Sequence, residues 1–278
     1  MSVKSSYHIH STYCDGNNTI EEMVQKAINK NFTHIGFSSH APSPQQYHND
    51  CLMNINAYEK YKNEVMSMRE KYRDKINIYL GLEYDCYEDI GMAQLVPVAD
   101  LDYYILSVHS LGIKNQIRAI DGTIEEFEEL LALDGEGIRS IIKRYYSLLT
   151  LQVIKNKPDI IGHFDIIKKN NAVSNYFNDK DNWYLDIVSE SLDNIRKTGC
   201  VMEINTGGVA RYGTECLYPS DEILRMIKDY DIALMLNSDA HTSDHLDFFY
   251  KEVIEKIKKI GIKRLHFITE NGWDDYKI

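Results

Sequence analysis

Residues 6–40 have the sequence SYHIHSTYCDGNNTIEEMVQKAINKNFTHIGFSSH, and this stretch sets the pattern for the rest of the chain. Short runs with apolar residues at 6–10 and 34–38 predict strands. Between them, the apolar residues of 19–31 fall on one helical face, and Thr19 followed by two glutamates is typical of a helix N-terminus. A strand, a helix and a second strand in this order predict a parallel α/β protein.

The same alternation continues along the chain. Further strands are predicted at 76–83, 103–109, 160–163, 201–205 and 233–237, with an eighth run at 264–269. Helical patterns cover 57–73, 136–156, 183–198, 220–229 and 247–260. The number of units favours a (β/α) barrel over a short open sheet, and we expect one domain over 1–278. The least regular stretches, 41–56, 110–135 and 168–182, predict long loops that shape a substrate pocket.

Composition narrows the class of protein. The 278 residues carry a formal net charge of −11, which gives none of the basic footprint of a nucleic-acid binder. The excess of acid suits a protein that holds divalent cations, although an acidic surface also simply aids solubility. The five cysteines, at 14, 51, 86, 200 and 216, form no CxxC pair, and there is no apolar leader or membrane-span run. We therefore expect a soluble cytoplasmic enzyme with reduced thiols.

Side chains of the kind that bind metals follow the predicted strands. In a parallel barrel the C-terminal ends of all strands share one face, so these side chains converge despite their separation in sequence. The HxH pair after the first strand supports this, because period-two geometry places both rings on one side of the strand. The predicted ligands are His8, His10, Asp15, His40, Glu83, His109, His163, Asp239 and His241.

Each of these residues also has a purely structural interpretation. A lone strand-end histidine such as His109 is more often a hydrogen-bonded structural residue, and Cys14 is best explained by packing. The combined pattern favours metal binding over a structural role, because six of the ten histidines stand at strand ends. The other four histidines are interpreted as structural or surface residues: His34, His48, His245 and His266. Of these, His48 and His245 are expected nearest to the mouth of the barrel. Imidazole and carboxylate without thiolate suit Zn, Mn or Fe.

At this level of detail the sequence resembles a known family. The segments HIHSTYCDG, SSH, GLEYD, SVHS, GHFDIIKK, EINTGG and NSDAH, in this order, resemble the polymerase and histidinol phosphatase (PHP) superfamily. The chain length and the segments GHFDIIKK and EINTGG are similar to its monofunctional histidinol-phosphatases. The resemblance runs from Tyr7 to His241 and implies a distorted (β/α)7 TIM-like barrel, with the eighth predicted strand outside the ring or appended to it.

The resemblance also implies how the ligands are shared among two or three divalent ions. His8, His10, Glu83 and Asp239 would hold the first ion. Glu83, as a bridge, would hold the second with His109 and His163, and the third would lie between Asp15, His40 and His241. Many members have SDH where this chain has Ser38-Ser39-His40, so the tuning of the ligands is expected to differ. Glu203 is not a ligand in this scheme and is expected to contact substrate, to orient a ligand or to be structural.

The implied reaction is hydrolysis of L-histidinol phosphate to L-histidinol and inorganic phosphate, in histidine biosynthesis. Metals close together activate a bridging hydroxide that attacks phosphorus, so no nucleophilic side chain is required. For the cation that neutralises the phosphoryl charge we select Arg211, in the predicted loop EINTGGVARYG, with Arg118 and Lys168 as weaker candidates. A metal-bound water, Asp239 or His241 would protonate the leaving group, and the sequence does not decide among them. Substrate contacts are expected from Arg211, Glu203 and Tyr212, and Asp165 is a further carboxylate in reach.

Three alternatives remain at this point. The first is a PHP-type phosphoesterase that acts on another small phosphate monoester or a nucleotide. The second is a metal-binding barrel without turnover, against which no expected ligand is substituted. The third is a metal-dependent amidohydrolase, which shares HxH but commonly needs a ligand lysine that the strand ends here lack. We expect a small-molecule substrate, no nucleic acid and no membrane partner.

Overall fold

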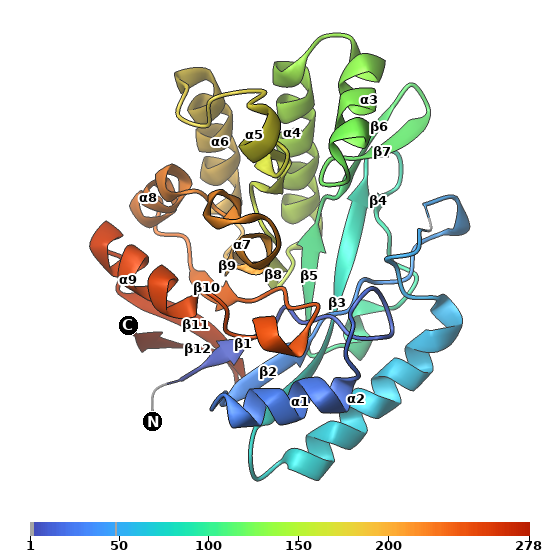
Figure 1. Cartoon of the computed structure of the whole chain (residues 1–278), viewed down its shortest axis with the longest axis vertical. Coiled ribbons are helices and arrows are strands. Elements are labelled where there is room, and N and C mark those ends of the chain that lie inside the picture. The colour runs from blue at the N-terminus through green and yellow to red at the C-terminus, as the bar shows by residue number, and fades with distance from the viewer. Residues whose placement is uncertain (1–2, 48) are drawn as a thin grey trace.

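Seven parallel strands form the centre of the molecule. The computed structural model describes residues 3–47 and 49–278. The strands are hydrogen-bonded in the order β1, β2, β3, β5, β8, β9 and β10, so neighbours in sequence are neighbours in the sheet (Figure 1). Their bounds are Ser5–Ser6, His34–Phe37, Asn77–Tyr87, Tyr103–Ser107, Ile160–Ile161, Val201–Asn205 and Leu234–Asn237.

The sheet curves until its first and last strands meet. Beyond the short β1 ladder, Ile9 forms an isolated parallel bridge with Ala240. His10 N donates to Ala240 O at 3.0 Å, and Ala240 N donates to His8 O at 3.3 Å. The result is a nearly closed seven-stranded barrel, which confirms the predicted fold class. Strands β1 and β8 are shorter than predicted, although Gly162 N still donates to Leu106 O at 3.0 Å beyond the end of β8.

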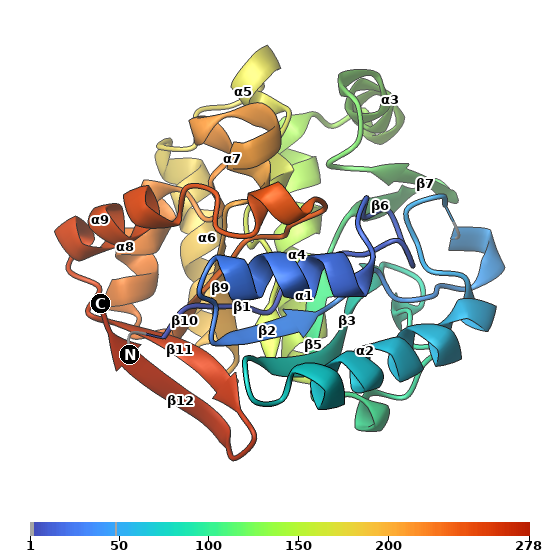
Figure 2. The same cartoon turned by 60° about the horizontal axis from the view of Figure 1, so that its bottom comes forward.

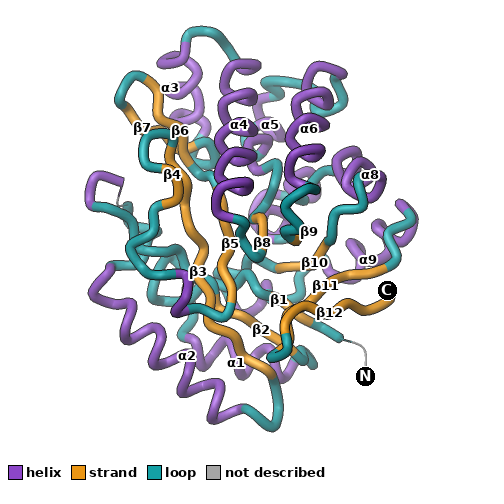
Figure 3. The backbone as a smooth tube through the Cα atoms, turned by 180° about the vertical axis from the view of Figure 1, so that it is seen from behind, coloured by secondary structure: helices purple, strands orange, loops and turns teal. Residues whose placement is uncertain are grey.

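Helices cover the outside of the barrel (Figure 3). In α1, Thr19 Oγ1 accepts from Glu22 N at 3.3 Å while the Glu22 carboxylate accepts from Thr19 N at 2.8 Å, which is the predicted capping box. None of the helices in the described residues has the length and apolar composition needed to cross a membrane. The long helices are α1 (Ile20–Asn29), α2 (Tyr58–Tyr72), α4 (Ile138–Asn156), α6 (Asn182–Ile195), α8 (Asp221–Asp229) and α9 (Tyr250–Ile260).

The side chains inside the barrel alternate with those that face the helices. Tyr79, Tyr103, Ile105, Val201 and Met235 pack together as one cluster. Their immediate neighbours along each strand belong to the larger core beneath the helices. Continuing by two residues along these strands, the interior rows change from apolar side chains to Glu83 and Glu203. The interior is thus apolar at the N-terminal end of the strands and polar at the C-terminal end.

Two hairpins lie outside this ring. The predicted eighth strand, β11 (Arg264–Thr269), pairs antiparallel with β12 (Gly272–Lys277) rather than joining the barrel. Figure 2 shows this hairpin below the ring, beside β10. A second hairpin, β6 (Ser110–Ile113) with β7 (Gln116–Ala119), is followed by α3 (Ile124–Asp134). The β6–β7 hairpin and α3 occupy the stretch 110–135, which was predicted to be mostly loop, since a hairpin inserted after a strand carries no signal of the helical crossover pattern.

Shorter elements occupy the other connections. The β3 extension pairs with β4 (Gly91–Met92). The loop 41–56 contains the 3-10 turns Gln45–Tyr47 and Ile55–Ala57, and 168–182 contains α5 (Asn171–Ser174). The segment predicted as the loop of Arg211 is instead a short helix, α7 (Gly207–Tyr212), so that prediction was wrong in its local structure.

Candidate metal centre

The predicted metal ligands meet at the C-terminal end of the barrel. Glu83 stands within β3, and the histidines and Asp239 follow the ends of their strands. A cavity of about 370 Å³ opens above them. His8 and His10 are fully buried beneath it, whereas the other predicted ligands line its wall. The structure thus brings together all the residues that were singled out by their position at strand ends.

One group of ligand atoms comes from His8, His10 and Asp239. The Nε2 atom of His10 lies 3.2 Å from Asp239 Oδ1, and that of His8 lies 3.7 Å from the same oxygen. Glu83 Oε2 approaches from the other side, 3.1 Å from His8 Nε2. This is the set expected to hold the first ion.

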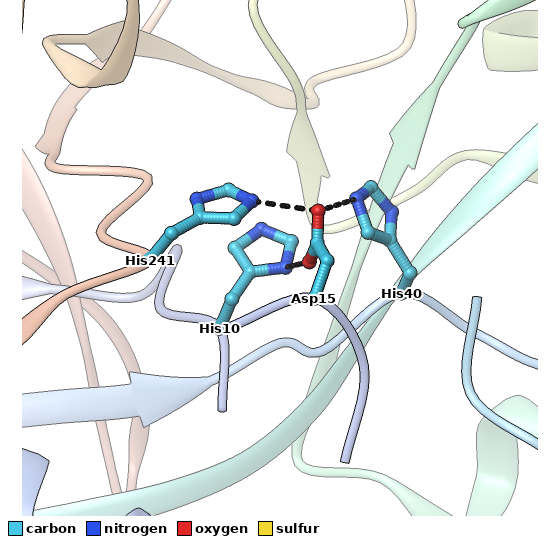
Figure 4. Close-up of side chains that lie close together, drawn as sticks. All are labelled: His10, Asp15, His40 and His241. Atoms are coloured by element: carbon cyan, nitrogen blue, oxygen red, sulfur yellow. Dashed lines mark hydrogen bonds and ion pairs between the residues drawn. The ribbon is translucent and has the colours of Figure 1, made fainter. Parts of the chain in front are cut away.

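A second group contains His10, Asp15, His40 and His241 (Figure 4). The carboxylate of Asp15 stands between the rings, with Oδ2 at 3.1 Å from His241 Nε2 and Oδ1 at 3.4 Å from His10 Nδ1. The rings of His10 and His241 stack with centroids 4.0 Å apart. Three of these four residues are those expected around the third ion.

The third group joins His40, Glu83 and His109. Glu83 is central to the site, because its oxygens also approach His8 and His163, the latter at 3.0 Å. This agrees with the expected bridging position. His163 Nε2 lies 3.0 Å from His109 Nε2, so the pair expected around the second ion is also in contact, while His40 stands between the second and third sets.

Several of the nitrogen and oxygen atoms in the site lack hydrogen-bond partners and are suited to bind cations. Buried polar atoms normally have hydrogen-bond partners, and leaving them without any costs free energy. Within the described residues, several atoms that face the centre of the site are buried without a hydrogen-bond partner: His8 Nε2, His10 Nε2, Asp15 Oδ1, His40 Nδ1 and Glu83 Oε2. Imidazole nitrogens and carboxylate oxygens at this spacing are the ligands that divalent transition ions prefer. The donor set is therefore that of a divalent-metal site.

Burial and neighbouring charges act in opposite directions on the pKa values of several groups in the site. Burial would lower the pKa of His8, but the carboxylates of Glu203, Glu83 and Asp239 raise it to about 10. Burial would raise the pKa of Glu83, but His8, His40 and His109 hold it well below its usual value. Burial dominates at His40 and lowers its pKa to about 4. The carboxylates thus remain anionic and are available to cations.

Three side chains beneath the site orient its histidines and Glu83. Glu203 accepts from His8 Nδ1 at 3.0 Å, and Ser107 Oγ donates to Glu83 Oε1 at 2.6 Å. Asp85 forms a close ion pair with His109 Nδ1. Such partners fix the ring orientation of ligand histidines and strengthen metal binding. Asp85 was not among the predicted site residues, although its position two residues after Glu83 in a strand places both side chains on one face.

Glu203 is a structural neighbour of the ligands and does not line the cavity. It is fully buried, and its oxygens accept from Asn205 Nδ2 at 2.7 Å, Asn237 Nδ2 at 2.8 Å and His163 N at 2.7 Å. With His8 added, every lone pair has a donor. Of the three roles considered for Glu203, the geometry favours orientation of a ligand over contact with substrate.

Arg211 and Tyr212 project from α7 at the cavity edge. Arg211 Nη2 donates to Asp239 Oδ2 at 2.9 Å, and Nη1 lies 3.0 Å from His241 Nδ1. Burial opposes the charge of Arg211, but Asp239 raises its pKa, so the guanidinium stays charged. The same contact holds the pKa of Asp239, which burial would raise, well below its usual value. The ring of Tyr212 is 54% exposed and so is accessible to a bound molecule.

The other cations proposed from the sequence do not reach the cavity. Arg118 pairs with Glu129 at 3.0 Å outside it, and Lys168 is buried against Asp165. Instead, the adjacent Lys169 lines the cavity and places its ammonium 4.6 Å from the Tyr212 ring centroid. Sequence alone gives no means to distinguish two adjacent lysines, because the turn that follows His163 decides which one points inward.

The remaining residues discussed from the sequence lie at the margin of the site. Ser39, where many family members have an acid, shares a hydrogen bond with Ser11 between hydroxyl oxygens 2.9 Å apart. Cys14 Sγ lies 3.4 Å from His10 Nδ1 and belongs to no metal-type group. His34 packs against Phe267, and His266 lies 3.3 Å from Leu234 O, while His245 is in a 3-10 turn. His48 lies outside the described residues.

Comparisons with known proteins show the family and the fold. The PHP domain family matches residues 6–207. The histidinol-phosphatase of Bacillus subtilis (strain 168) is 27% identical over 91% of this chain and 99% of its own length. A Listeria monocytogenes structure proposed to be a histidinol phosphatase superposes with a TM-score of 0.77 at 21% identity, over 90% of this chain and 99% of that one. Histidinol phosphate phosphatase from Lactococcus lactis, solved with Zn, L-histidinol and phosphate, gives 0.69 at 23% identity over 98% of each chain.

Proposed function

The chain belongs to the PHP domain family, and on that premise we propose that it is a histidinol-phosphatase. It hydrolyses L-histidinol phosphate to L-histidinol and inorganic phosphate, a step of histidine biosynthesis. Relatives with this name align over nearly their whole length with nearly the whole of this chain. The enzyme class is phosphoric monoester hydrolase, with a small-molecule substrate.

The observation that carries this proposal is the convergence of imidazoles and carboxylates around one cavity with a guanidinium at its edge. Ion clusters next to an arginine are suited to a phosphoryl group, because positive charge on several sides matches its oxygens. The fork-shaped cation can also bind two oxygens of one phosphoryl group at once.

We assign the ligands as the resemblance implies. His8, His10, Glu83 and Asp239 would hold one ion, and Asp15, His40 and His241 another. Glu83 would bridge to His109 and His163, where the donor set allows a further ion. Zinc is the ion of the Lactococcus lactis structure, and manganese and iron are the other candidates for these donors. When bound, such ions supply activation of water and neutralisation of phosphoryl charge.

The protein's own side chains supply the rest of the reaction. Arg211 would bind two phosphoryl oxygens, and its contact with Asp239 holds the fork at the site before substrate arrives. Asp239 stays anionic beside Arg211, so the proton for the leaving alkoxide would come from His241, on the same side of the cavity, or from a water molecule in the cavity. Lys169 adds a second cation on the cavity wall, and the Tyr212 ring beside it would contact the organic part of the substrate. Glu203 and Asp85 would hold the His8 and His109 rings in place.

A cytoplasmic location follows from this proposal, since substrate and product belong to amino-acid biosynthesis. The five cysteines are free thiols in the structure, as they would be in a reducing compartment. We also propose that the chain acts as one catalytic unit, because the ligands come from both halves of the sequence.

A substrate panel tests the assignment. Purified protein supplied with Mn, Zn or Fe is assayed for kcat/KM on L-histidinol phosphate, on sugar phosphates and on nucleoside monophosphates. The proposal expects L-histidinol phosphate to be preferred by at least about 100-fold, because a site that hydrogen-bonds polar substrate groups rejects analogues that lack them. A stronger preference for another monoester would retain the metal chemistry and reject the substrate.

A further inference from the structure

The segment 162–169 contains a buried ion pair that the proposed reaction does not use. Asp165 is fully buried, and Lys168 is 6% exposed. Lys168 Nζ lies 3.1 Å from Asp165 Oδ2, and neither side chain lines the metal cavity. Burial of two charges is costly unless they are well hydrogen-bonded, so the groups that this pair binds indicate what it is for.

The pair binds the backbone of one other segment. Lys168 Nζ donates to Leu217 O at 2.7 Å, and Ser220 N donates to Asp165 Oδ2 at 3.0 Å. The Lys168 ammonium also lies 5.4 Å from the centroid of the Tyr218 ring. Between these anchors, Tyr218 O accepts from Asn205 N at 2.6 Å, at the end of β9. The pair therefore fastens residues 217–220 to the connection that follows β8.

Residues 216–218 form the surface on which α7 rests. Gly208, in the first turn of α7, has no space for a side chain, because a Cβ there would overlap Cys216 O and the Tyr218 ring. Gly207 is equally confined, with Asp239 Cβ 2.7 Å from the position of its missing Cβ. A helix packed this closely follows any shift of the segment beneath it. Because α7 carries Arg211, such a shift moves the guanidinium away from the phosphate position.

We propose that Asp165 and Lys168 are positioning residues that hold Arg211 against the phosphate site through residues 216–220 and α7. This rests on the proposed function, since it requires Arg211 to contact the phosphoryl group. Lys168 has no direct route to substrate, because its ammonium is engaged with Asp165 and Leu217 O outside the cavity. Its effect on catalysis is therefore expected to vanish when Arg211 is absent.

A double-mutant cycle tests this directly. The variant Asp165→Asn/Lys168→Met removes both charges, so that neither is left buried alone, and the amide still accepts from Ser220 N. It is combined with Arg211→Ala and assayed with p-nitrophenyl phosphate and with inorganic phosphate as competitive inhibitor. With Arg211 present, we expect kcat/KM to fall and the phosphate inhibition constant to rise by about 10- to 100-fold, as for small misplacements of a catalytic group. In the Arg211→Ala background, the same change is expected to cost less than about twofold, because coupled residues are not additive.

The controls separate positioning from general damage. Lys256→Met removes a partly exposed partner of Asp221 beside the same segment and is expected to leave kinetics unchanged. Metal content and thermal unfolding of the Asp165→Asn/Lys168→Met variant are expected to match a folded, metal-loaded protein. An equal loss in both Arg211 backgrounds, no loss in either, or loss of metal would each overturn the inference. If Arg211→Ala alone behaves as wild type, the phosphate contact of the proposed function is itself wrong, which is a different result from additivity.

Discussion

The two ends of the barrel are built on opposite principles. At the N-terminal end the interior is filled by aromatic and aliphatic side chains, and two tyrosine hydroxyls donate to backbone carbonyls: Tyr103 to Tyr7 O at 2.6 Å, and Tyr7 to Ile268 O at 2.6 Å. At the C-terminal end the interior holds histidines and carboxylates with unpartnered atoms. These polar groups of the N-terminal end thus find hydrogen-bond partners within the chain, whereas those of the C-terminal end need bound ions as partners. Stability and chemistry are thus separated along the strands.

This contrast predicts that substitutions at the C-terminal end change activity far more than stability. The largest effect is expected for Glu83→Gln, because Glu83 contacts five of the histidines. Turnover of L-histidinol phosphate should fall by about 1000-fold, since each 1.4 kcal/mol of lost charge stabilisation costs about tenfold. Metal content by elemental analysis should fall with it, while circular dichroism stays native. If the variant keeps its metals and its activity, Glu83 does not have the central metal-binding role proposed for it.

At the N-terminal end the reverse is expected. Tyr103→Ala opens a hole inside the barrel, where the ring packs against Gly36 and Gly81, and should cost about 3–5 kcal/mol of unfolding free energy in urea. The folded fraction should retain wild-type KM and metal content. The matched variant Tyr103→Phe removes only the bond to Tyr7 O and should cost about 1–3 kcal/mol. Loss of metal binding in either variant, with stability kept, would contradict the separation of the two ends.

An intermediate effect is expected for Asp85→Asn, which keeps the shape of the His109 partner but removes its charge. Metal affinity, measured by competition with a chelator, should weaken by about 10- to 100-fold. Tyr87→Phe, which removes the 3.3 Å bond from Tyr87 to Asp85, serves as the control and should weaken metal binding far less. Equal metal affinities of wild type and Asp85→Asn would exclude an orienting role.

The smallest effect is expected for Thr19→Ala, which removes the cap of α1. Thr19 follows Asp15 closely in sequence, yet its hydroxyl binds only at the helix start. Unfolding free energy should fall by about 1 kcal/mol, and metal binding and turnover should be unchanged. A drop in metal affinity would mean that α1 holds Asp15 in place. Residues that serve metal binding would then extend further from the cavity than proposed.

The fold and the convergence of the candidate ligands could largely be predicted, because both follow from the regular spacing of residues along strands and helices. HxH, the strand-end placement and the alternation with helices depend only on geometry within each strand, and the structure brings His8, His10 and His241 together as expected. Asp85, Lys169 and the helix of Arg211 depend on contacts between distant segments. Asp85 acquires its role from His109, and the turn after His163 decides that Lys169 rather than Lys168 lines the cavity. The spacing of residues within one segment does not indicate which distant segment will contact it.

The most direct test of the central claim is phosphate release from L-histidinol phosphate by protein stripped with a chelator and then supplied with Mn, Zn or Fe. We predict that stripping abolishes release and that at least one of these ions restores it to the level of the untreated protein. Release that persists in the stripped, metal-free protein, or that no ion restores while the fold remains intact, would contradict a metal-dependent histidinol-phosphatase.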